Sequence, residues 1–219
     1  GTAQNDFLFG RGGDDTLSGA VGDDVILGDS ADALIDGGEG TDTLLVNANY
    51  LQADDAKLIG VEKVSTTLIR NQTNQEFTID LSGQSEGFEI TGGTLNDTIT
   101  GGAGNDTING GDGTDTVNYT GAVTITSDAN GFMVDAGLEG IDTLNGVEKV
   151  IAGAQTFLLV GNGGYDSIQD AVDAATGDEI ILVSGNYIES VTIGSTKAGL
   201  TIEGLAGSQL TGGIFVQAD

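Results

Sequence analysis

The sequence predicts an all-β protein, a parallel β-roll or β-helix solenoid with one short capping helix near residues 166–175. Three observations predict this fold. Residues 1–45 and 92–118 consist of consecutive nine-residue units, and a large aliphatic residue stands eighth in every unit. The chain also holds 38 glycines and no proline. Such a composition favours many tight turns between short strands.

The repeated units define one turn and one strand each. The first array reads GTAQNDFLF, GRGGDDTLS, GAVGDDVIL, GDSADALID and GGEGTDTLL, and the second reads GGTLNDTIT, GGAGNDTIN and GGDGTDTVN. Glycines in the first, second and fourth places allow a tight turn, and the last three residues form a short strand whose aliphatic side chain points inward. Two units therefore complete a coil, and units two apart stack at one strand spacing of about 4.8 Å.

Aspartate occupies the sixth place of most units. These aspartates are Asp6, Asp15, Asp24, Asp42, Asp97, Asp106 and Asp115. Stacking places Asp6 over Asp24, Asp24 over Asp42, and Asp97 over Asp115. Two carboxylates about 5 Å apart repel by roughly 3 kcal/mol at an effective dielectric constant near 20. The columns of aspartates therefore predict bound cations.

Calcium is the cation that this chemistry favours. It takes six to eight hard oxygen ligands in flexible geometry, and the turns offer carboxylates beside backbone carbonyls. The chain has no histidine and no cysteine, the side chains that transition metals prefer. We therefore expect several Ca²⁺ ions. Two other interpretations are an acidic disordered chain, which a 38% hydrophobic content disfavours, and aspartates that only cap turns.

The pattern GGxGxDxUx, with U a large aliphatic residue, resembles the nonapeptide of the repeats-in-toxin (RTX) family. This resemblance implies that each ion is held by the first and third carbonyls and the Asp of one unit, and by the second and fourth carbonyls and the Asp of the unit two later. The implied ligands of one site are Gly1, Ala3, Asp6, Ala20, Gly22 and Asp24. Those of the next site are Gly19, Val21, Asp24, Gly38, Gly40 and Asp42. Those of the second array are Gly92, Thr94, Asp97, Gly111, Gly113 and Asp115, and the second and seventh units contribute Gly10, Gly12, Asp15 and Asp106.

Two units depart from the pattern. Ala33 stands where the fourth unit should carry its aspartate, so the site of Asp15 is expected to be weakened, with Asp32 one place off as a substitute. Asp106 has no ideal unit two before it, because Phe88 stands in the sixth place there. Both departures predict damaged sites.

Charged residues outside the arrays are expected to be structural. The unit GLEGIDTLN at 137–145 fits the nonapeptide, but it has no clear partner two units away, so Asp142 is interpreted as structural. The segment GVEKV follows each array, at 60–64 and at 146–150. Its charged residues, which are Glu62, Lys63, Glu148 and Lys149, are interpreted as a solvated strand face.

The chain divides into five segments. They are a first RTX β-roll at 1–45, a metal-free β continuation at 46–91, a second RTX β-roll at 92–118, a metal-free β continuation at 119–159, and the start of a right-handed parallel β-helix at 160–219. In the last segment Asp166 is the expected N-cap of a helix whose apolar face holds Ile168, Ala171, Val172 and Ala175. The order SIQDAV, EIILV, GNYIESVTI and LTIEG resembles the opening of a pectate-lyase-type β-helix. We expect the intact protein to be longer.

Charge and motif content limit the function. A formal net charge of −28 argues against nucleic acid and anionic membranes as partners, and no apolar stretch is long enough for membrane insertion. The expected role is that of a secreted cell-surface component, an S-layer, filament, adhesin or matrix protein that folds on calcium after type I secretion. Its expected partners are calcium, further copies of itself or cell-surface polysaccharide.

The alternative is a fragment of an extracellular polysaccharide lyase, hydrolase or epimerase with its active site beyond residue 219. We expect no catalytic site within this chain. Tyr187, Glu189 and Asp178 are the weak candidates for such a site. An HExxH zinc protease motif is absent from the sequence.

Overall fold

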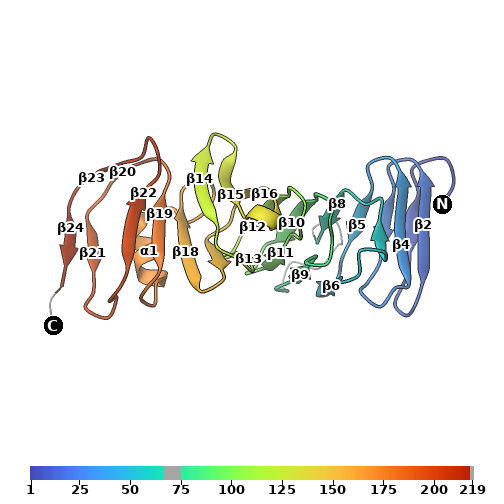
Figure 1. The fold of residues 1–219 in the computed structure, drawn as a ribbon, viewed down its shortest axis with the longest axis horizontal. Helices are drawn as coiled ribbons and strands as arrows, with labels where there is room; N and C mark the ends of the chain where they lie inside the picture. Colours follow the sequence, from blue (N-terminus) through green and yellow to red (C-terminus); the bar gives the residue numbers. More distant parts are fainter. Residues whose placement is uncertain (67–74, 218–219) are drawn as a thin grey trace.

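The inward aliphatic residues of the repeats stack into the core of an elongated solenoid. The computed structural model describes residues 1–66 and 75–217, and in this part the chain makes about ten turns. Figure 1 shows the two termini at opposite ends of the long axis. The predicted all-β fold with one short helix is confirmed.

One long side of the solenoid is a nine-stranded sheet. Its order within the described residues is β1 (Phe7–Phe9), β3 (Val25–Leu27), β5 (Thr43–Leu45), β8 (Lys63–Ser65), β10 (Glu89–Gly93), β12 (Thr107–Gly111), β16 (Ile141–Asn145), β15 (Gly131–Asp135) and β14 (Thr124–Asp128). The first seven strands of this order pair in parallel. The 3-10 helix at Gly137–Glu139 lies between β15 and β16 in the chain.

The opposite side is formed by two further sheets. The described part of the eight-stranded sheet has the order β22 (Thr201–Gly204), β19 (Ile180–Val183), β18 (Gln155–Val160), β17 (Lys149–Ala152), β13 (Thr116–Tyr119), β11 (Thr98–Thr100), β9 (Thr78–Asp80) and β6 (Tyr50–Leu51). The first array completes its coils with β2 (Thr16–Val21), β4 (Leu34–Glu39) and β7 (Leu58–Ile59). The predicted run of strand residues beyond Thr66 continues into residues outside the described ranges.

The register of the arrays is that of the nonapeptide. Leu8 pairs with Ile26 and Ile26 with Leu44, so the eighth residues of alternate units form one ladder. Ile26 and Leu44 are completely buried. Burial of each such side chain contributes about 1.5–3 kcal/mol to folding. The spacing of nine residues thus becomes a ladder of apolar side chains along the solenoid axis.

Antiparallel strands interrupt the parallel stacking after the second array. β14 and β15 form a hairpin, and β15 pairs antiparallel with β16. β17 then pairs antiparallel with β18 through the short connection at 153–154. β18, β19 and β22 are parallel to one another, so all three run opposite to the strands of the arrays. Neither reversal is predicted by the sequence patterns.

The C-terminal unit has its own coil geometry. β20 (Asn186–Ile188) pairs with β23 (Gln209–Thr211), and β21 (Val191–Ile193) pairs with β24 (Ile214–Val216), so three strands make one coil here. Helix α1 (Ile168–Ala174) buries Ile168, Ala171 and Val172 against this unit, as its pattern predicts. Its N-cap is Ser167 and not Asp166, because the Ser167 side chain accepts the N–H of Asp170.

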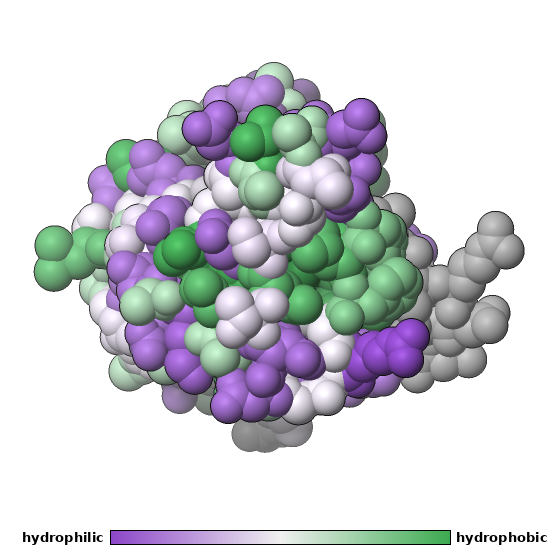
Figure 2. Space-filling model, turned by 90° about the vertical axis from the view of Figure 1, so that its right-hand side faces the viewer, coloured by the Kyte–Doolittle hydropathy of each residue, from purple (hydrophilic) through white to green (hydrophobic). Residues whose placement is uncertain are grey.

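The N-terminal end of the solenoid exposes apolar residues. Figure 2 shows hydrophobic residues gathered on this end of the molecule. Phe7 and Phe9 of the first coil are 53% and 58% exposed, and their rings lie 4.5 Å apart. No helix in the described residues has the length and apolar character needed to cross a membrane.

Candidate metal centre

The aspartates of the first array form a column held together by backbone hydrogen bonds. Each Asp precedes a strand of the nine-stranded sheet. The N–H of Asp6 donates to Oδ1 of Asp24 (2.6 Å), and the N–H of Asp24 donates to Oδ1 of Asp42 (2.7 Å). The N–H of Asp42 donates to Oε2 of Glu62 (2.7 Å). We call Asp6, Asp24, Asp42 and Glu62 the first column.

Two further columns follow the same rule. In the second column the N–H of Asp97 donates to Oδ1 of Asp115 (2.7 Å), and the N–H of Asp115 donates to Oε2 of Glu148 (2.7 Å). In the third column the N–H of Asp106 donates to Oδ1 of Asp142 (2.8 Å). The predicted stacking of Asp6 with Asp24, Asp24 with Asp42, and Asp97 with Asp115 is therefore present as backbone-to-carboxylate contacts.

The other carboxylate oxygen of the columns is buried and unpaired. Among the described residues, five such Oδ2 atoms have no hydrogen-bond partner, and they belong to Asp24, Asp42, Asp97, Asp106 and Asp115. All five side chains are at most 2% exposed. Burying a carboxylate oxygen without a donor costs several kcal/mol, on the order of the penalty for an unpaired buried polar group. These oxygens need a cation.

In both arrays, a glycine in the first place of a unit lies close to oxygen atoms that could bind an ion. A Cβ atom built on Gly92 would lie 2.6 Å from Oδ2 of Asp97 and would collide with the carbonyl oxygen of Gly110. A Cβ atom built on Gly19 would collide with Oδ2 of Asp24 and with the Gly37 carbonyl. Gly19 and Gly92 are thus each flanked by a carboxylate oxygen of their own unit and by a carbonyl oxygen of the next coil, an arrangement that we call the glycine cradle. This combination of hard oxygens fits calcium.

The backbone has positive φ values at the residues of three units whose carbonyls are predicted calcium ligands. Ala20 and Gly22 have φ values of 84° and 133°. Gly38 and Gly40 in the fifth unit, and Gly111 and Gly113 in the second array, also have positive φ. Ala20 holds a left-handed conformation that alanine seldom adopts, so the turn itself imposes the geometry. The three turns therefore present equivalent backbone groups.

Burial disfavours the charged form of three aspartates in the second and third columns. Burial raises the pKa of Asp97 to about 6, although the N–H of Phe77 donates to this carboxylate. Burial also raises the pKa values of Asp106 and Asp115 to about 7, and nearby carboxylates add to the effect. Because calcium stabilises the ionised form, the columns gain electrostatic free energy from it near neutral pH.

The fourth unit keeps its contact through a substitute. Asp32 is buried, and its Oδ1 accepts the N–H of Asp15 at 3.3 Å. Its Oδ2 accepts the N–H of Asp29 at 2.9 Å, so this oxygen is satisfied by the protein. The side chain of Asp32 therefore takes the place that Ala33 leaves, as a structural acceptor for Asp15.

Asp142 contacts Asp106, although the two residues are far apart in the sequence. It stacks on Asp106, 36 residues earlier, because the β14–β15 hairpin is inserted between the two coils. The partner lies four units away and not two, so a search at the fixed repeat spacing does not find it, and the structural role of Asp142 stays a prediction. The Tyr119 hydroxyl donates to Oδ2 of Asp142 at 2.8 Å, so this oxygen is already satisfied. On the other side of Asp106, Phe88 contributes its N–H and not a carboxylate.

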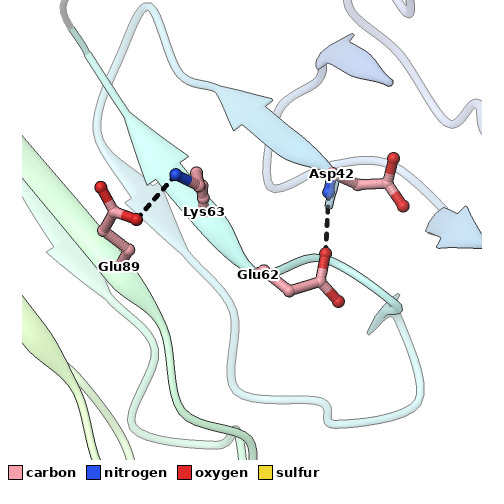
Figure 3. A network of polar contacts seen from close by, with 4 residues as sticks. All are labelled: Asp42, Glu62, Lys63 and Glu89. Carbon is pink, nitrogen blue, oxygen red and sulfur yellow. Dashed lines mark hydrogen bonds and ion pairs between the residues drawn. The ribbon is translucent and has the colours of Figure 1, made fainter. Parts of the chain in front are cut away.

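The sequence interpretation also missed Glu62 and Glu148 as members of the columns. Figure 3 shows the Glu62 carboxylate turned toward the backbone N–H of Asp42, whereas Lys63 forms a 2.7 Å ion pair with Glu89 on the strand face. Glu148 is only 7% exposed and is therefore not part of a solvated face. The repeated tripeptide GVE was the signal for these residues.

The weak catalytic candidates lie apart. The Glu189 carboxylate accepts the N–H groups of Ile168 and Gln169 at the start of α1. Asp178 instead lines a polar cavity of about 280 Å³ with Glu179, Thr156 and Thr176. The structure does not bring Glu189 and Asp178 into one site.

Carboxylates alone do not make a site in the described part of the chain. No group of three or more acidic side chains lies close enough together within residues 1–66 and 75–217 to hold an ion. An ion in the columns therefore requires backbone carbonyls beside the paired carboxylates. The predicted ligand sets have this mixed composition.

Comparison with protein families agrees with this geometry. The RTX calcium-binding nonapeptide repeat matches the chain in four copies, over residues 1–32, 22–48 and 91–121. These ranges include the aspartates of the two arrays and exclude Glu62, Asp142 and Glu148. Comparison with curated proteins gives no match.

Proposed function

Because the chain carries RTX calcium-binding nonapeptide repeats, we propose that it is a secreted structural or adhesive cell-surface component whose solenoid folds on calcium. The observation that carries the proposal is the set of five buried Oδ2 atoms without a hydrogen-bond donor in the described residues. They line successive coils of the two arrays, so the requirement for a cation is distributed along this part of the molecule. Such a distribution suits a load-bearing element.

Bound calcium supplies the positive charge that the columns lack. The paired aspartates of the first and second columns would hold it, together with the carbonyls of the glycine turns. Asp24, Asp42, Asp97 and Asp115 each also accept an N–H from the preceding coil, which orients the second oxygen toward the glycine cradle. The protein residues thereby join one coil to the next at the place where the ion would bind.

Extracellular calcium modules bind their ions in the range of about 10⁻⁴–10⁻³ M. At cytosolic calcium levels folding would bury the column carboxylates without a compensating cation, and the arrays would stay unfolded. An unfolded chain suits export through a type I secretion channel, and folding would follow outside the cell. The elongated shape and a net charge of −28 suit a spacer or a lattice component bridged by cations.

The proposal is tested by titrating calcium into the chelated chain and recording far-UV circular dichroism, with magnesium as the control. We expect a β-rich spectrum to appear with calcium and not with magnesium at equal concentration. Light scattering with and without purified cell-surface polysaccharide then tests for assembly. An unchanged β signal after chelation would contradict folding on calcium, and the absence of both assembly and polysaccharide binding would contradict the surface role.

A further inference from the structure

Two short turns replace nonapeptide turns at the ends of the first and second columns. Residues 60–62 and 146–148 both read GVE. The strand after the first turn pairs Lys63 with Thr43, and the strand after the second pairs Lys149 with Thr116. Each GVE turn therefore covers with three residues the part of the coil that residues 37–42 or 110–115 cover with six.

The glutamate of each short turn reaches the position of a column aspartate. Its side chain is one methylene longer, which offsets part of the lost backbone length. Oε2 of Glu62 accepts the N–H of Asp42, and Oε2 of Glu148 accepts the N–H of Asp115, both at 2.7 Å. The distance equals that of the Asp24 to Asp42 contact.

The glycine of each short turn reproduces the carbonyl side of the cradle. A Cβ atom built on Gly37 would lie 2.6 Å from Oδ2 of Asp42 and would collide with the Gly60 carbonyl. A Cβ atom built on Gly110 would lie 2.5 Å from Oδ2 of Asp115 and would collide with the carbonyl of Gly146. The same arrangement surrounds Gly19 and Gly92 within the nonapeptide arrays.

The aspartate oxygens that face the short turns are unsatisfied. Asp42 and Asp115 are both 0% exposed, and their Oδ2 atoms have no hydrogen-bond donor in the described part of the chain. In each case the Cβ position of the first glycine in the unit lies close to both the aspartate Oδ2 and the glycine carbonyl oxygen of the GVE turn. The unmet requirement for a cation therefore extends past the last nonapeptide.

We propose that each GVE turn completes a further calcium site, one between Asp42 and Glu62 and one between Asp115 and Glu148. This inference rests on the calcium binding of the proposed function and adds ligands that lie outside the matched repeats. Each site combines an aspartate of the last nonapeptide with the glutamate and the glycine carbonyl of the short turn. Water completes the coordination.

The Glu148 site joins the second array to the C-terminal unit. Glu148 lines a cavity of about 340 Å³ together with Tyr165, Asp166, Asp170, Gly111 and Gly113. The N–H of Leu159 also donates to the carbonyl of Glu148. The cavity has room for ion-bound water, and its lining comes from both the second array and the segment that leads into α1. Calcium held by Glu148 would therefore fix the second array to the unit that contains α1.

The test counts calcium ions bound by the full chain in equilibrium dialysis. We expect Glu62→Gln and Glu148→Gln each to lose one ion and the double variant to lose two. Glu203→Gln, at an exposed position of β22, is the matched control and should lose none. Glu148→Asp keeps the charge but is one methylene too short, so it should also lose the ion.

The outcomes separate this inference from the proposed function. A wild-type chain that binds no calcium overturns both. A wild-type chain that binds calcium, with Glu62→Gln and Glu148→Gln binding as many ions as Glu203→Gln, overturns only the inference. Circular dichroism at millimolar calcium confirms that the compared variants are folded.

A spectroscopic readout reports on the Glu148 site directly. Terbium replaces calcium in oxygen sites, and Tyr165 lines the same cavity as Glu148. We expect Tyr165→Phe to lower the tyrosine-sensitised terbium emission without changing the number of bound ions, and Glu148→Gln to lower both. Emission that Tyr165→Phe leaves unchanged would overturn the position of this site.

Discussion

Asp24 contacts two coils through its two carboxylate oxygens. Its Oδ1 accepts the N–H of Asp6, and its Oδ2 lies beside Gly19 against the carbonyl of Gly37. One side chain therefore belongs to two adjacent cradles. Asp42 has the same arrangement one coil later, between Asp24 and Glu62.

The double role of Asp24 predicts a double loss. We expect Asp24→Ala to lower the calcium stoichiometry by two ions, because both cradles lose a ligand. Asp14→Ala is the control, since Asp14 is exposed and belongs to none of the three columns. Isothermal titration calorimetry measures the stoichiometry. Equal values for the two variants would contradict the sharing of Asp24.

Glu179 gives the C-terminal unit an acid-sensitive contact. Burial acts to raise its pKa, but the Thr176 hydroxyl and the N–H groups of Thr176 and Gly177 donate to its carboxylate and lower the pKa below 4.5. Because the folded pKa lies below the unfolded one, this stabilisation is complete above pH 4.5 and is lost as pH falls through the folded pKa.

We expect Glu179→Gln to reduce the stability of this unit by about 1–2 kcal/mol at neutral pH, since three donors lose a charged acceptor. Below the folded pKa the variant and the wild type should converge. Urea unfolding followed at pH 3 and at pH 7 measures both effects. A difference in stability that does not change with pH would contradict the role of the charge.

The turn element depends on glycine in its first place. We expect Gly19→Ala to destabilise the calcium-bound chain by about 1–3 kcal/mol, because the added Cβ collides with Asp24 and Gly37. Gly121→Ala is the matched control, since nothing lies within 4 Å of its Cβ position. Thermal unfolding in calcium compares them, and similar losses in both variants would contradict the cradle.

Periodicity alone predicts most elements of the arrays. The ladder from Leu8 through Ile26 to Leu44 follows from a period of nine, because identical units stack in identical register. Periodicity fails where the length of a turn changes. The GVE turns are three residues short, and Asp142 meets Asp106 only after an inserted hairpin. A contact between units whose separation differs from the repeat length depends on the folded backbone. A search at the fixed repeat length therefore does not predict it.

Side-chain hydrogen bonds determine two features that the repeat pattern does not predict, the role of Asp32 and the N-cap of α1. Asp32 replaces the missing aspartate because its side chain turns back to the N–H groups of Asp15 and Asp29. Ser167 caps α1 because its hydroxyl lies three residues before Asp170 and accepts the N–H there. In each case two neighbouring residues could fill the role. The backbone conformation determines which side chain reaches the N–H groups, and the sequence pattern does not specify that conformation.

At the scale of the whole molecule, the need for calcium is uneven. Among the described residues, none of the buried unpaired carboxylate oxygens lies beyond Asp115. The C-terminal unit has an apolar core of its own, with Val160, Ile168, Ile181 and Val191 among its buried members. The arrays therefore carry the charge repulsion, and the unit after them does not.

This difference predicts two unfolding transitions. We expect chelation to unfold the arrays and to leave the C-terminal unit folded, because the latter does not depend on neutralised columns. Hydrogen exchange in chelator should show fast exchange for amides of β3 and β11 and protection for those of β19. Complete loss of protection in β19 at the same chelator concentration would contradict this division.

The antiparallel pairing of β17 with β18 limits the ways in which the coils can stack on one another. Similar repeats can stack one coil out of step at little cost, since each offers the next the same edge. The connection at 153–154 allows no such choice, because it folds β18 directly back on β17. β17 is therefore the strand that must lie beside the C-terminal unit. The β17–β18 hairpin therefore fixes the stacking register of the repetitive coils that precede it.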